Sequence, residues 1–302
     1  MSAYDPTLPA VLFPGQGSHT PGMRDLVARS APELLDRCVE LVGEDPFPRV
    51  AESTRFAQPA LFCASMAAWE ELGLQAGVAA GHSLGEIAAL TAAGVFDLDD
   101  ALQLVVTRGR LMSDAALADG DGGMLAVIGG TLEDAEAIAE ESGMTVANDN
   151  APGQVVLSGS RDALELAEEA ARAHGRRTLP VAVAGAFHSR AMEPVVAPFR
   201  AALEAVTRRE PSFPVFSCAT ARPFEDVPRE LSEALTHPVR WRETMLALNA
   251  AGATRFVEVG PGKVLTGLIK RIAPDVEAFA LDEATAPGRL AVPASETLAT
   301  TH

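Results

Sequence analysis

The stretch GHSLGE, residues 81–86, decides how this chain folds. Its pattern Gly-x-Ser-x-Gly suits a sharp turn from strand to helix, because small residues on both sides of the serine let the backbone bend and leave the hydroxyl exposed. The apolar residues before it predict a short buried strand, and the Ala- and Leu-rich residues after it predict a packed helix. Taken alone, the motif is equally compatible with a glycine-bounded turn in which Ser83 merely caps the helix.

Length and composition limit the size of the core and the classes of partner that this chain can have. The chain has 302 residues, enough for a large core, and a formal net charge of -17 from 24 basic and 41 acidic side chains. That charge argues against nucleic acid or an anionic membrane surface as the main partner, because both require a positive face. Hydrophobic residues make up 48% and aromatic residues only 5%, so the interior must consist mainly of Ala, Val and Leu.

The cysteines predict a reducing compartment. Cys38, Cys63 and Cys218 are odd in number, widely spaced and in no metal-ligand pattern, which excludes a disulfide framework and gives no sign of a metal site. The first residues lack a basic segment followed by an apolar stretch, and no apolar run approaches the length of a membrane span. We expect a cytoplasmic monomer.

The order of predicted elements indicates an α/β fold with an insertion. Strands and helices alternate over residues 1–120, including one helix expected over residues 24–42. Residues 121–184 show the order β-α-β-β-α-β of a small ferredoxin-like unit, with a last strand expected within residues 176–185. The α/β pattern resumes over residues 185–284. We predict a large α/β domain in two parts, an inserted small domain at 121–184, and a flexible tail at 285–302.

A serine nucleophile needs a base, and the chain holds six histidines. His82 is a poor candidate because adjacent side chains at a sharp turn diverge. His188, within GAFHSRAM, lies where the inserted domain returns to the main one, and clefts are common between domains. We interpret His188 as the base, with a structural histidine as the alternative.

Motifs found in order along almost the whole chain carry a family resemblance. They are FPGQGSHTPGM, GHSLGE, TRGRLM, NDNAPGQVVLSGS, GAFHSRAM, HPVRW and FVEVGPGKVLTGLIKRI. With this combination the chain resembles the malonyl-CoA:acyl carrier protein transacylases, a family shared by fatty acid synthesis and polyketide acyltransferases. The resemblance implies an α/β-hydrolase-like large domain with an inserted ferredoxin-like small domain, in agreement with the element order.

The resemblance also implies roles for site residues. Ser83 becomes the nucleophile and His188 its base, while Gln16 and Leu84 supply backbone N–H groups to an oxyanion hole. An N–H directly after the nucleophile points at the tetrahedral oxygen, and a Gly-flanked turn can bring a second one close. Without this context the turn FPGQGSH could cradle a phosphate, but it lacks both Gly-Lys-Ser/Thr and the GxGxxG spacing.

The carboxylate of a hydrolase triad is missing. Asp149 is the one tempting carboxylate beside a motif, and we expect it to be a turn residue. In the resembled family a main-chain carbonyl near the segment NPVxW orients the histidine instead. The corresponding segment here is HPVRW, residues 237–241, with His237 in place of the usual Asn.

Arg108 separates a transferase from a simple hydrolase. It follows the apolar stretch QLVV on a predicted helix, where a guanidinium would pair bidentately with the free carboxylate of a malonyl group. The alternative is an arginine on the helix surface. Phe187 stands where, in the resembled polyketide enzymes, an aromatic residue accompanies malonyl and serine accompanies methylmalonyl; His82 and Asn150 are further candidate substrate-binding residues.

The implied activity is transfer of malonyl from malonyl-CoA, through an acyl-serine, to the phosphopantetheine thiol of an acyl carrier protein, with no bound cofactor. Candidate docking residues for this acidic partner are Arg190, Lys263 and Lys270. Three alternatives stay open. They are a transferase of another acyl unit in a polyketide pathway, an editing hydrolase of the same fold, and a non-catalytic docking module.

Overall fold

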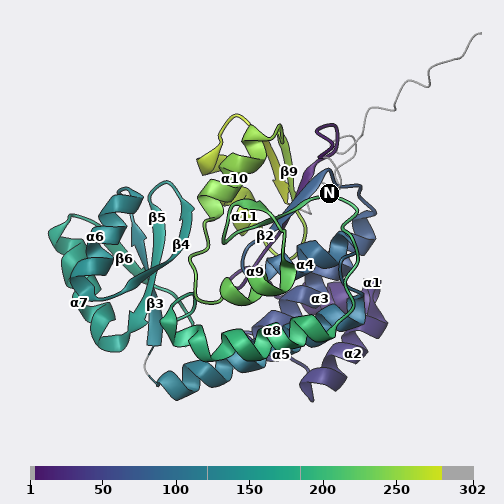
Figure 1. The fold of residues 1–302 in the computed structure, drawn as a ribbon, viewed down its shortest axis with the longest axis horizontal. Coiled ribbons are helices and arrows are strands. Elements are labelled where there is room, and N and C mark those ends of the chain that lie inside the picture. Colours follow the sequence, from purple (N-terminus) through teal and green to yellow (C-terminus); the bar gives the residue numbers. More distant parts are fainter. Residues whose placement is uncertain (1–3, 121, 184, 281–302) are drawn as a thin grey trace, which may run out of the picture.

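A computed structural model describes residues 4–120, 122–183 and 185–280. Within them the strands form a six-stranded and a four-stranded sheet, so the chain has the mixed α/β fold that the sequence predicts. Figure 1 shows the smaller sheet with two helices as one lobe, beside a larger lobe built on the other sheet. The predicted tail over 285–302 lies outside the described residues.

The large sheet is almost entirely parallel. In spatial order its strands are β10 (Glu277–Ala280), β9 (Arg255–Glu258), β1 (Ala10–Phe13), β2 (Val78–Gly81), β7 (Val215–Ser217) and β8 (Arg222–Pro223), and only β8 runs antiparallel to its neighbour. Every residue of β1 and β2 is buried, as expected when helices cover both faces of a sheet.

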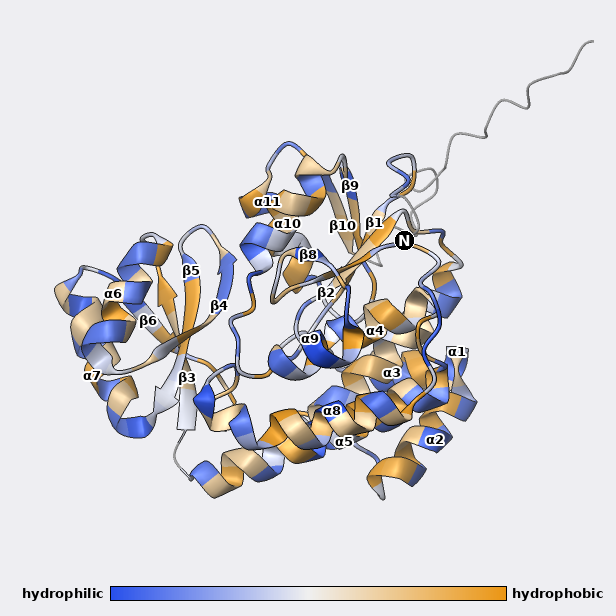
Figure 2. Cartoon of the chain, viewed as in Figure 1, coloured by the Kyte–Doolittle hydropathy of each residue, from blue (hydrophilic) through white to orange (hydrophobic). Residues whose placement is uncertain are grey.

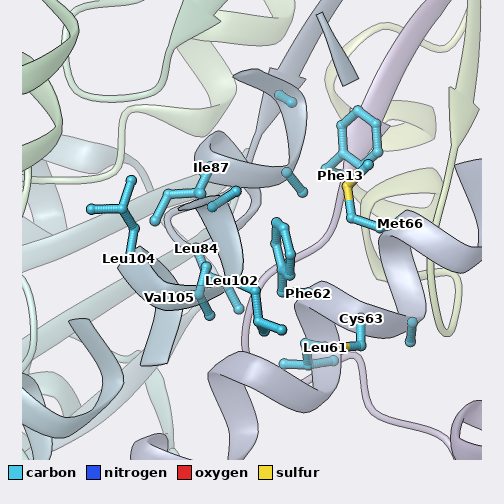
Figure 3. Packing of buried hydrophobic residues seen from close by; sticks show 14 of the residues in the cluster. Phe13, Leu61, Phe62, Cys63, Met66, Leu84, Ile87, Leu102, Leu104 and Val105 are labelled. Atoms are coloured by element: carbon cyan, nitrogen blue, oxygen red, sulfur yellow. The ribbon is translucent and has the colours of Figure 1, made fainter. Parts of the chain in front are cut away.

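Helices pack on both faces of this sheet. Alternate residues of β1 face opposite ways, so Val11 and Phe13 join one core cluster and Ala10 and Leu12 join another. The first cluster contains side chains of α3 (Thr54–Leu72), α4 (Gly85–Ala92) and α5 (Leu98–Asp119), which Figure 3 shows interleaved. The second contains α10 (Trp241–Ala250) and α11 (Val264–Ile272). The remaining helices of this lobe are α1 (Met23–Ser30), α2 (Pro32–Val42), α8 (Glu193–Ala205), α9 (Val227–Glu233), and the short 3₁₀ turns η1 (Phe47–Arg49) and η2 (Arg190–Met192).

The single helix expected over residues 24–42 is wrong. The chain forms α1 and α2 instead, with Ala31 between them in a non-helical conformation. Pro32 is the cause, because proline has no N–H to donate and disfavours helical geometry in the residue before it. Proline is well placed as the first residue of a new helix, which is its position in α2.

The small sheet has the predicted ferredoxin-like topology. Its chain order is β3 (Gly122–Ile128), α6 (Leu132–Ser142), β4 (Thr145–Ala151), β5 (Gln154–Ser160), α7 (Arg161–Ala173) and β6 (Arg177–Pro180), and its spatial order is β4-β5-β3-β6. All pairs are antiparallel. The last strand is shorter than the pattern of residues 176–185 suggests. Its partner bonds reach only from Arg177 to Pro180.

The two faces of the small sheet differ in what they contact. Leu125, Val127 and Leu157 pack under α6 and α7 in a cluster of their own. On the other face, Met124 and Val156 belong to the core cluster of the large lobe. Figure 2 shows α6 and α7 with many hydrophilic residues, whereas α3 and α4 are mostly hydrophobic. The small sheet thus turns one face to the large lobe, and the site described below lies there.

No helix in the described part of the chain is long and apolar enough to cross a membrane.

Candidate active site

Ser83 lies in a tight elbow between β2 and α4. Its φ is 53°, a left-handed conformation that is uncommon for any residue other than glycine. The neighbouring glycines make this turn possible. A Cβ on Gly81 would lie 1.9 Å from the backbone carbon of Gly85, and a Cβ on Gly85 would lie 2.1 Å from the carbonyl oxygen of Phe13. Both positions therefore require glycine, and the hydroxyl of Ser83 is presented at the carboxyl end of the sheet.

His188 is hydrogen-bonded to this hydroxyl. Its Nε2 lies 2.8 Å from Ser83 Oγ, and its Nδ1 lies 2.9 Å from the carbonyl oxygen of Ala234 and 3.1 Å from that of His237. Since carbonyls only accept, Nδ1 carries the proton and Nε2 is free to accept one from Ser83. The orienting groups are thus main-chain carbonyls, one of them in the segment 237–241.

The environment keeps His188 neutral. The residue is 5% exposed, and it too has a left-handed backbone, with φ 55°. Burial first, and then the nearby charge of Arg108, lower the pKa of His188 to about 4, although the two carbonyls oppose the shift. A neutral imidazole at physiological pH is the form that a general base requires.

Arg108 reaches the same serine from α5. Its Nη2 donates to Ser83 Oγ at 3.0 Å and its Nη1 to Gln58 Oε1 at 2.7 Å, and the residue is 5% exposed. Burial lowers the pKa of Arg108 to about 10, while the charge of Glu86 opposes that shift, so the guanidinium stays charged at neutral pH. Among the described residues no carboxylate lies within 4.0 Å of this guanidinium. The site thus holds a buried cation that has no ion-pair partner in the described part of the chain.

Gln16 and Leu84 lie where the oxyanion hole was expected. Both line the cavity beside Ser83, and within the described residues neither backbone N–H donates to an acceptor. The turn that carries Gln16 is packed closely against the elbow, since a Cβ on Gly15 would lie 2.5 Å from the carbonyl oxygen of His82. The side-chain Oε1 of Gln16 accepts from Thr54 Oγ1 at 2.9 Å. Two unpaired donors next to a nucleophile suit a developing oxyanion.

A cavity of about 140 Å³ joins these groups and lies between the two sheets. Among the residues chosen from the sequence, Gln16, His82, Ser83, Leu84, Arg108, Asn150, Phe187 and His188 line it. A larger hollow of about 880 Å³ lies elsewhere, next to α8 and β7, and contains none of these residues.

The cavity also contains residues that sequence reasoning missed. They are Gln58, Met112, Met124, Asn148, Val156, Val181 and Val183. Gln58 carried a signal, because it is a buried amide within a mostly apolar helix. Its Nε2 donates to Thr54 Oγ1 at 2.8 Å, so it links the partner of Gln16 to Arg108. The apolar members gave no signal, since apolar residues of strands, helices and connections are common and only the packing of the two lobes brings these to the cavity.

His82 and Asn150 are partners of each other. His82 Nε2 lies 2.8 Å from Asn150 Oδ1, and the His82 ring lies 5.4 Å from that of the buried Trp241. The elbow of the large sheet is thereby joined to β4 of the small sheet.

Asp149 is not a turn residue, contrary to the sequence-based expectation. It lies within β4, is buried, and its carboxylate binds the guanidinium of Arg242 on α10 at 2.8–3.1 Å. The misreading arose because Asn-Asp-Asn-Ala-Pro-Gly has the composition of a turn, whereas pairing with β5 and with Val239 makes it extended.

The candidate docking cations lie outside the cavity. Arg190 is exposed on η2, directly after the His188 segment, and Lys263 and Lys270 are exposed at the start and toward the end of α11. Within the part of the chain that the structure describes, their side chains form no hydrogen bond or ion pair. In the same residues no group of His, Cys, Asp and Glu could hold a metal ion.

Comparison with known proteins agrees with the site's composition. The family model described as "Acyl transferase domain" matches residues 11–280. The malonyl CoA-acyl carrier protein transacylase of Bacillus subtilis (strain 168) is 37% identical over 299 residues, which cover 91% of this chain and 93% of that protein.

Solved structures agree with the fold as well. The malonyl-CoA:acyl carrier protein transacylase of Xanthomonas oryzae pv. oryzae matches with a TM-score of 0.84 and 35% identity, covering 90% of this chain and 93% of that chain. A malonyl-transacylase in complex with its type II PKS acyl-carrier protein matches with a TM-score of 0.83 and 35% identity, covering 90% and 94%. The resemblance found in the motifs is confirmed, and the chain belongs to the acyl transferase domain family, among the malonyl-CoA:acyl carrier protein transacylases.

Proposed function

We propose that this protein transfers a malonyl group from malonyl-CoA to the phosphopantetheine thiol of an acyl carrier protein. The observation that carries the proposal is the buried, unpaired guanidinium of Arg108, which contacts the hydroxyl of Ser83. A buried charge is costly unless it is paired, so the site favours a substrate that brings its own carboxylate. Malonyl has a carboxylate two carbons from its thioester carbonyl, and an acetyl group has none.

In the first half-reaction Ser83 Oγ attacks the thioester carbonyl while its proton passes to Nε2 of His188, 2.8 Å away. The backbone N–H groups of Gln16 and Leu84 bind the resulting oxyanion. Removing one such donor costs about 10²–10³ in kcat in characterised enzymes. Collapse of the tetrahedral intermediate breaks the C–S bond, and His188 returns its proton to the departing coenzyme A thiolate.

In the second half-reaction the carrier-protein thiol gives its proton to His188 and attacks the acyl-serine. The C–O bond to Ser83 breaks, and Oγ recovers the proton from His188 Nε2. The carbonyls of Ala234 and His237 hold the imidazolium through Nδ1 in both halves. The Arg108–carboxylate pair keeps the acyl group in a small cavity, which favours a thiol that enters along the pantetheine path over bulk water.

Phe187 supports a preference for an unbranched extender unit. The residue is buried, lines the cavity and directly precedes His188. Bulk at this place would crowd a substituent on the carbon between the carboxylate and the thioester. The discrimination available from excluding one methyl group is about 1–3 kcal/mol.

We further propose that the carrier protein docks on exposed cations near the cleft. The chain is acidic overall, with a net charge of -17, so an acidic carrier must be attracted locally. Arg190, Lys263 and Lys270 are exposed and have no intramolecular ion pair among the described residues.

The pathway has two candidates. The polyketide-associated transacylase in complex with its carrier matches this chain at the same 35% identity as the Xanthomonas oryzae enzyme. Malonyl transfer in polyketide synthesis is therefore supported as well as malonyl transfer in fatty acid synthesis. Cys38, Cys63 and Cys218 are buried free thiols, which fits a reducing compartment, and we place the reaction in the cytoplasm.

Intact-mass measurement tests the proposal. The protein is mixed separately with malonyl-CoA, methylmalonyl-CoA and acetyl-CoA, and we expect a malonyl adduct on the wild type and none on Ser83→Ala. Addition of a holo acyl carrier protein should then discharge the adduct to the carrier. Discharge to water in the absence of carrier would indicate a hydrolase, and an adduct that persists on Ser83→Ala would reject the nucleophile.

A further inference from the structure

The two carbonyls that orient His188 belong to a short connection between α9 and α10. Nδ1 of His188 lies 2.9 Å from the carbonyl oxygen of Ala234 and 3.1 Å from that of His237. His237 is itself exposed, and its ring is held to the end of α9, where Nδ1 lies 2.7 Å from the carbonyl oxygen of Glu233. The orientation of the base therefore depends on α9 and also on what anchors the residues that follow His237.

Strand β4 of the small sheet anchors them. Val239 donates its N–H to the carbonyl of Ala147 at 2.8 Å, and Asp149 donates its N–H to the carbonyl of Val239 at 2.9 Å. These bonds form an isolated parallel bridge at Asn148, so the connection is one short extra strand on the edge of the small sheet. A bridge of this length is weak by itself, because no longer ladder supports it.

An ion pair closes the same contact. Arg242 Nε lies 3.1 Å and 2.9 Å from Oδ1 and Oδ2 of Asp149, and Arg242 Nη2 lies 2.8 Å from Oδ2. The Asp149 side chain is 10% exposed and that of Arg242 is 34% exposed, so water screens the pair less than it screens surface pairs. Arg242 stands in the first turn of α10, where the helix dipole disfavours a cation. The carboxylate of Asp149 on the other lobe, and not the dipole of α10, therefore explains why an arginine stands at this position.

The neighbours of this pair contact His82, the residue before the nucleophile. Asn150, next to Asp149, is 2.8 Å from His82, and Trp241, next to Arg242, packs against the His82 ring. Two consecutive residues of β4 and two of α10 thus hold both the elbow and the connection that carries the carbonyls.

We propose that Asp149 and Arg242 are positioning residues, whose ion pair fixes the connection 234–241 against β4 and so holds the imidazole of His188 in line with Ser83. This inference rests on the proposed function, in which His188 is the base. Neither residue lines the substrate cavity. They act through the backbone of residues 237–239, and their loss should affect proton transfer rather than substrate binding.

The experiment measures kcat and KM for acylation of Ser83 by malonyl-CoA in Asp149→Asn, Arg242→Gln and the double variant. Asp149→Asn keeps the shape and removes the charge. We expect kcat to fall about ten- to a hundredfold, as for small displacements of catalytic groups, with KM unchanged because Arg108 is untouched. The double variant should lose no more than either single variant, since both break the same interaction. Arg242→Gln alters a partly exposed side chain, so this variant still tests the ion pair if Asp149→Asn fails to fold.

Arg271 supplies a matched control. It also joins the two lobes, from α11 to the β4–β5 turn, by donating at 2.6 Å to Gln154 Oε1 and at 2.6 Å to the carbonyl of Pro152. It does not contact the connection that carries the carbonyls. Arg271→Gln should therefore leave kcat at the wild-type level. An equal loss of kcat in Arg271→Gln would mean that any loosening of the lobes has this effect, and it would overturn the inference.

The pH profile gives a second readout. Burial and the charges of Arg108 and His82 hold the pKa of His188 well below its ordinary value. A base that moves toward water regains a higher pKa, so the acidic limb of kcat/KM should shift to higher pH in Asp149→Asn and not in Arg271→Gln. An unchanged kcat and pH profile in both pair variants, with His188→Ala inactive, would reject the inference alone. A His188→Ala variant as active as the wild type would reject the proposed function itself.

Discussion

The large and small sheets line one cavity, but they contribute to it in different ways. The large sheet provides reacting groups at the carboxyl ends of adjacent parallel strands: Gln16 follows β1 and Ser83 follows β2. Parallel α/β sheets commonly bind ligands at that edge. The antiparallel small sheet has no such edge. It contributes a face, through Met124 and Val156, and the strand β4.

The two sheets also differ in how far apart in the sequence their interacting residues lie. The elbow is complete within residues 81–86, whereas Asn150 binds a partner 68 residues away and Asp149 one 93 residues away. Reacting groups here come from compact motifs, and the groups that position them come from contacts between distant segments.

Replacing Gly85 by alanine should have the largest effect. The new Cβ would lie 2.1 Å from the carbonyl oxygen of Phe13, and β1 cannot retreat because it is paired on both sides. We expect acylation of Ser83 to be lost, with destabilisation of about 1–3 kcal/mol or more. Both are measured on one preparation, by intact mass and by urea unfolding.

The small sheet offers the matched variant, Gly123→Ala. Its Cβ would lie 2.8 Å from Leu164 Cδ1, the end of a flexible side chain that can move aside. We expect this variant to fold and to be acylated at nearly the wild-type rate. If Gly85→Ala behaves like Gly123→Ala, the elbow tolerates a side chain and the contrast between the sheets is not steric.

Arg108→Ala tests whether the large lobe also selects the substrate. Truncating one member of a buried charge pair typically costs about 2–5 kcal/mol, or roughly thirty- to several-thousandfold. That loss should fall on malonyl-CoA, while acetyl-CoA, which has no carboxylate, should react as well as before or better. The measurement is kcat/KM for both thioesters.

Arg110→Ala is the control, because Arg110 is exposed on the same helix and does not line the cavity. Arg110→Ala should leave kcat/KM unchanged for both malonyl-CoA and acetyl-CoA. Equal losses for both thioesters in Arg108→Ala would mean that Arg108 supports the fold only.

Charge reversal at Arg190, Lys263 or Lys270 should have the smallest effect. Exposed ion pairs contribute about 0.2–1 kcal/mol, so each reversal should raise the carrier-protein KM only a few-fold, more at low salt, and spare acylation by malonyl-CoA. Arg177→Glu, on the exposed edge strand β6 of the small sheet, should leave that KM unchanged. If the carrier-protein KM rose only in Arg177→Glu, the docking surface would lie on the small sheet instead.

Sequence reasoning was most accurate where the signal is local. The elbow, the fold class and the β-α-β-β-α-β order follow from glycine spacing and hydrophobic periodicity, and the structure agrees with them. It erred at Pro32, where a local signal was overlooked, and at Asp149, where composition suggested a turn. Gln58 was missed because a polar residue in a mostly apolar helix signals a polar partner but does not indicate which one.

The sequence by itself predicted that a serine would sit in a sharp turn from strand to helix, since glycines flank it at 81 and 85. It also predicted, through the order of its strand and helix patterns, a large α/β domain with an inserted β-α-β-β-α-β unit. Only the tertiary structure decided that Nδ1 of His188 meets the carbonyls of Ala234 and His237, and that β4 holds that connection. The physical reason is that a main-chain carbonyl is common to every residue. Its role as an acceptor is therefore invisible in the sequence and arises only when packing brings one particular carbonyl to one particular donor.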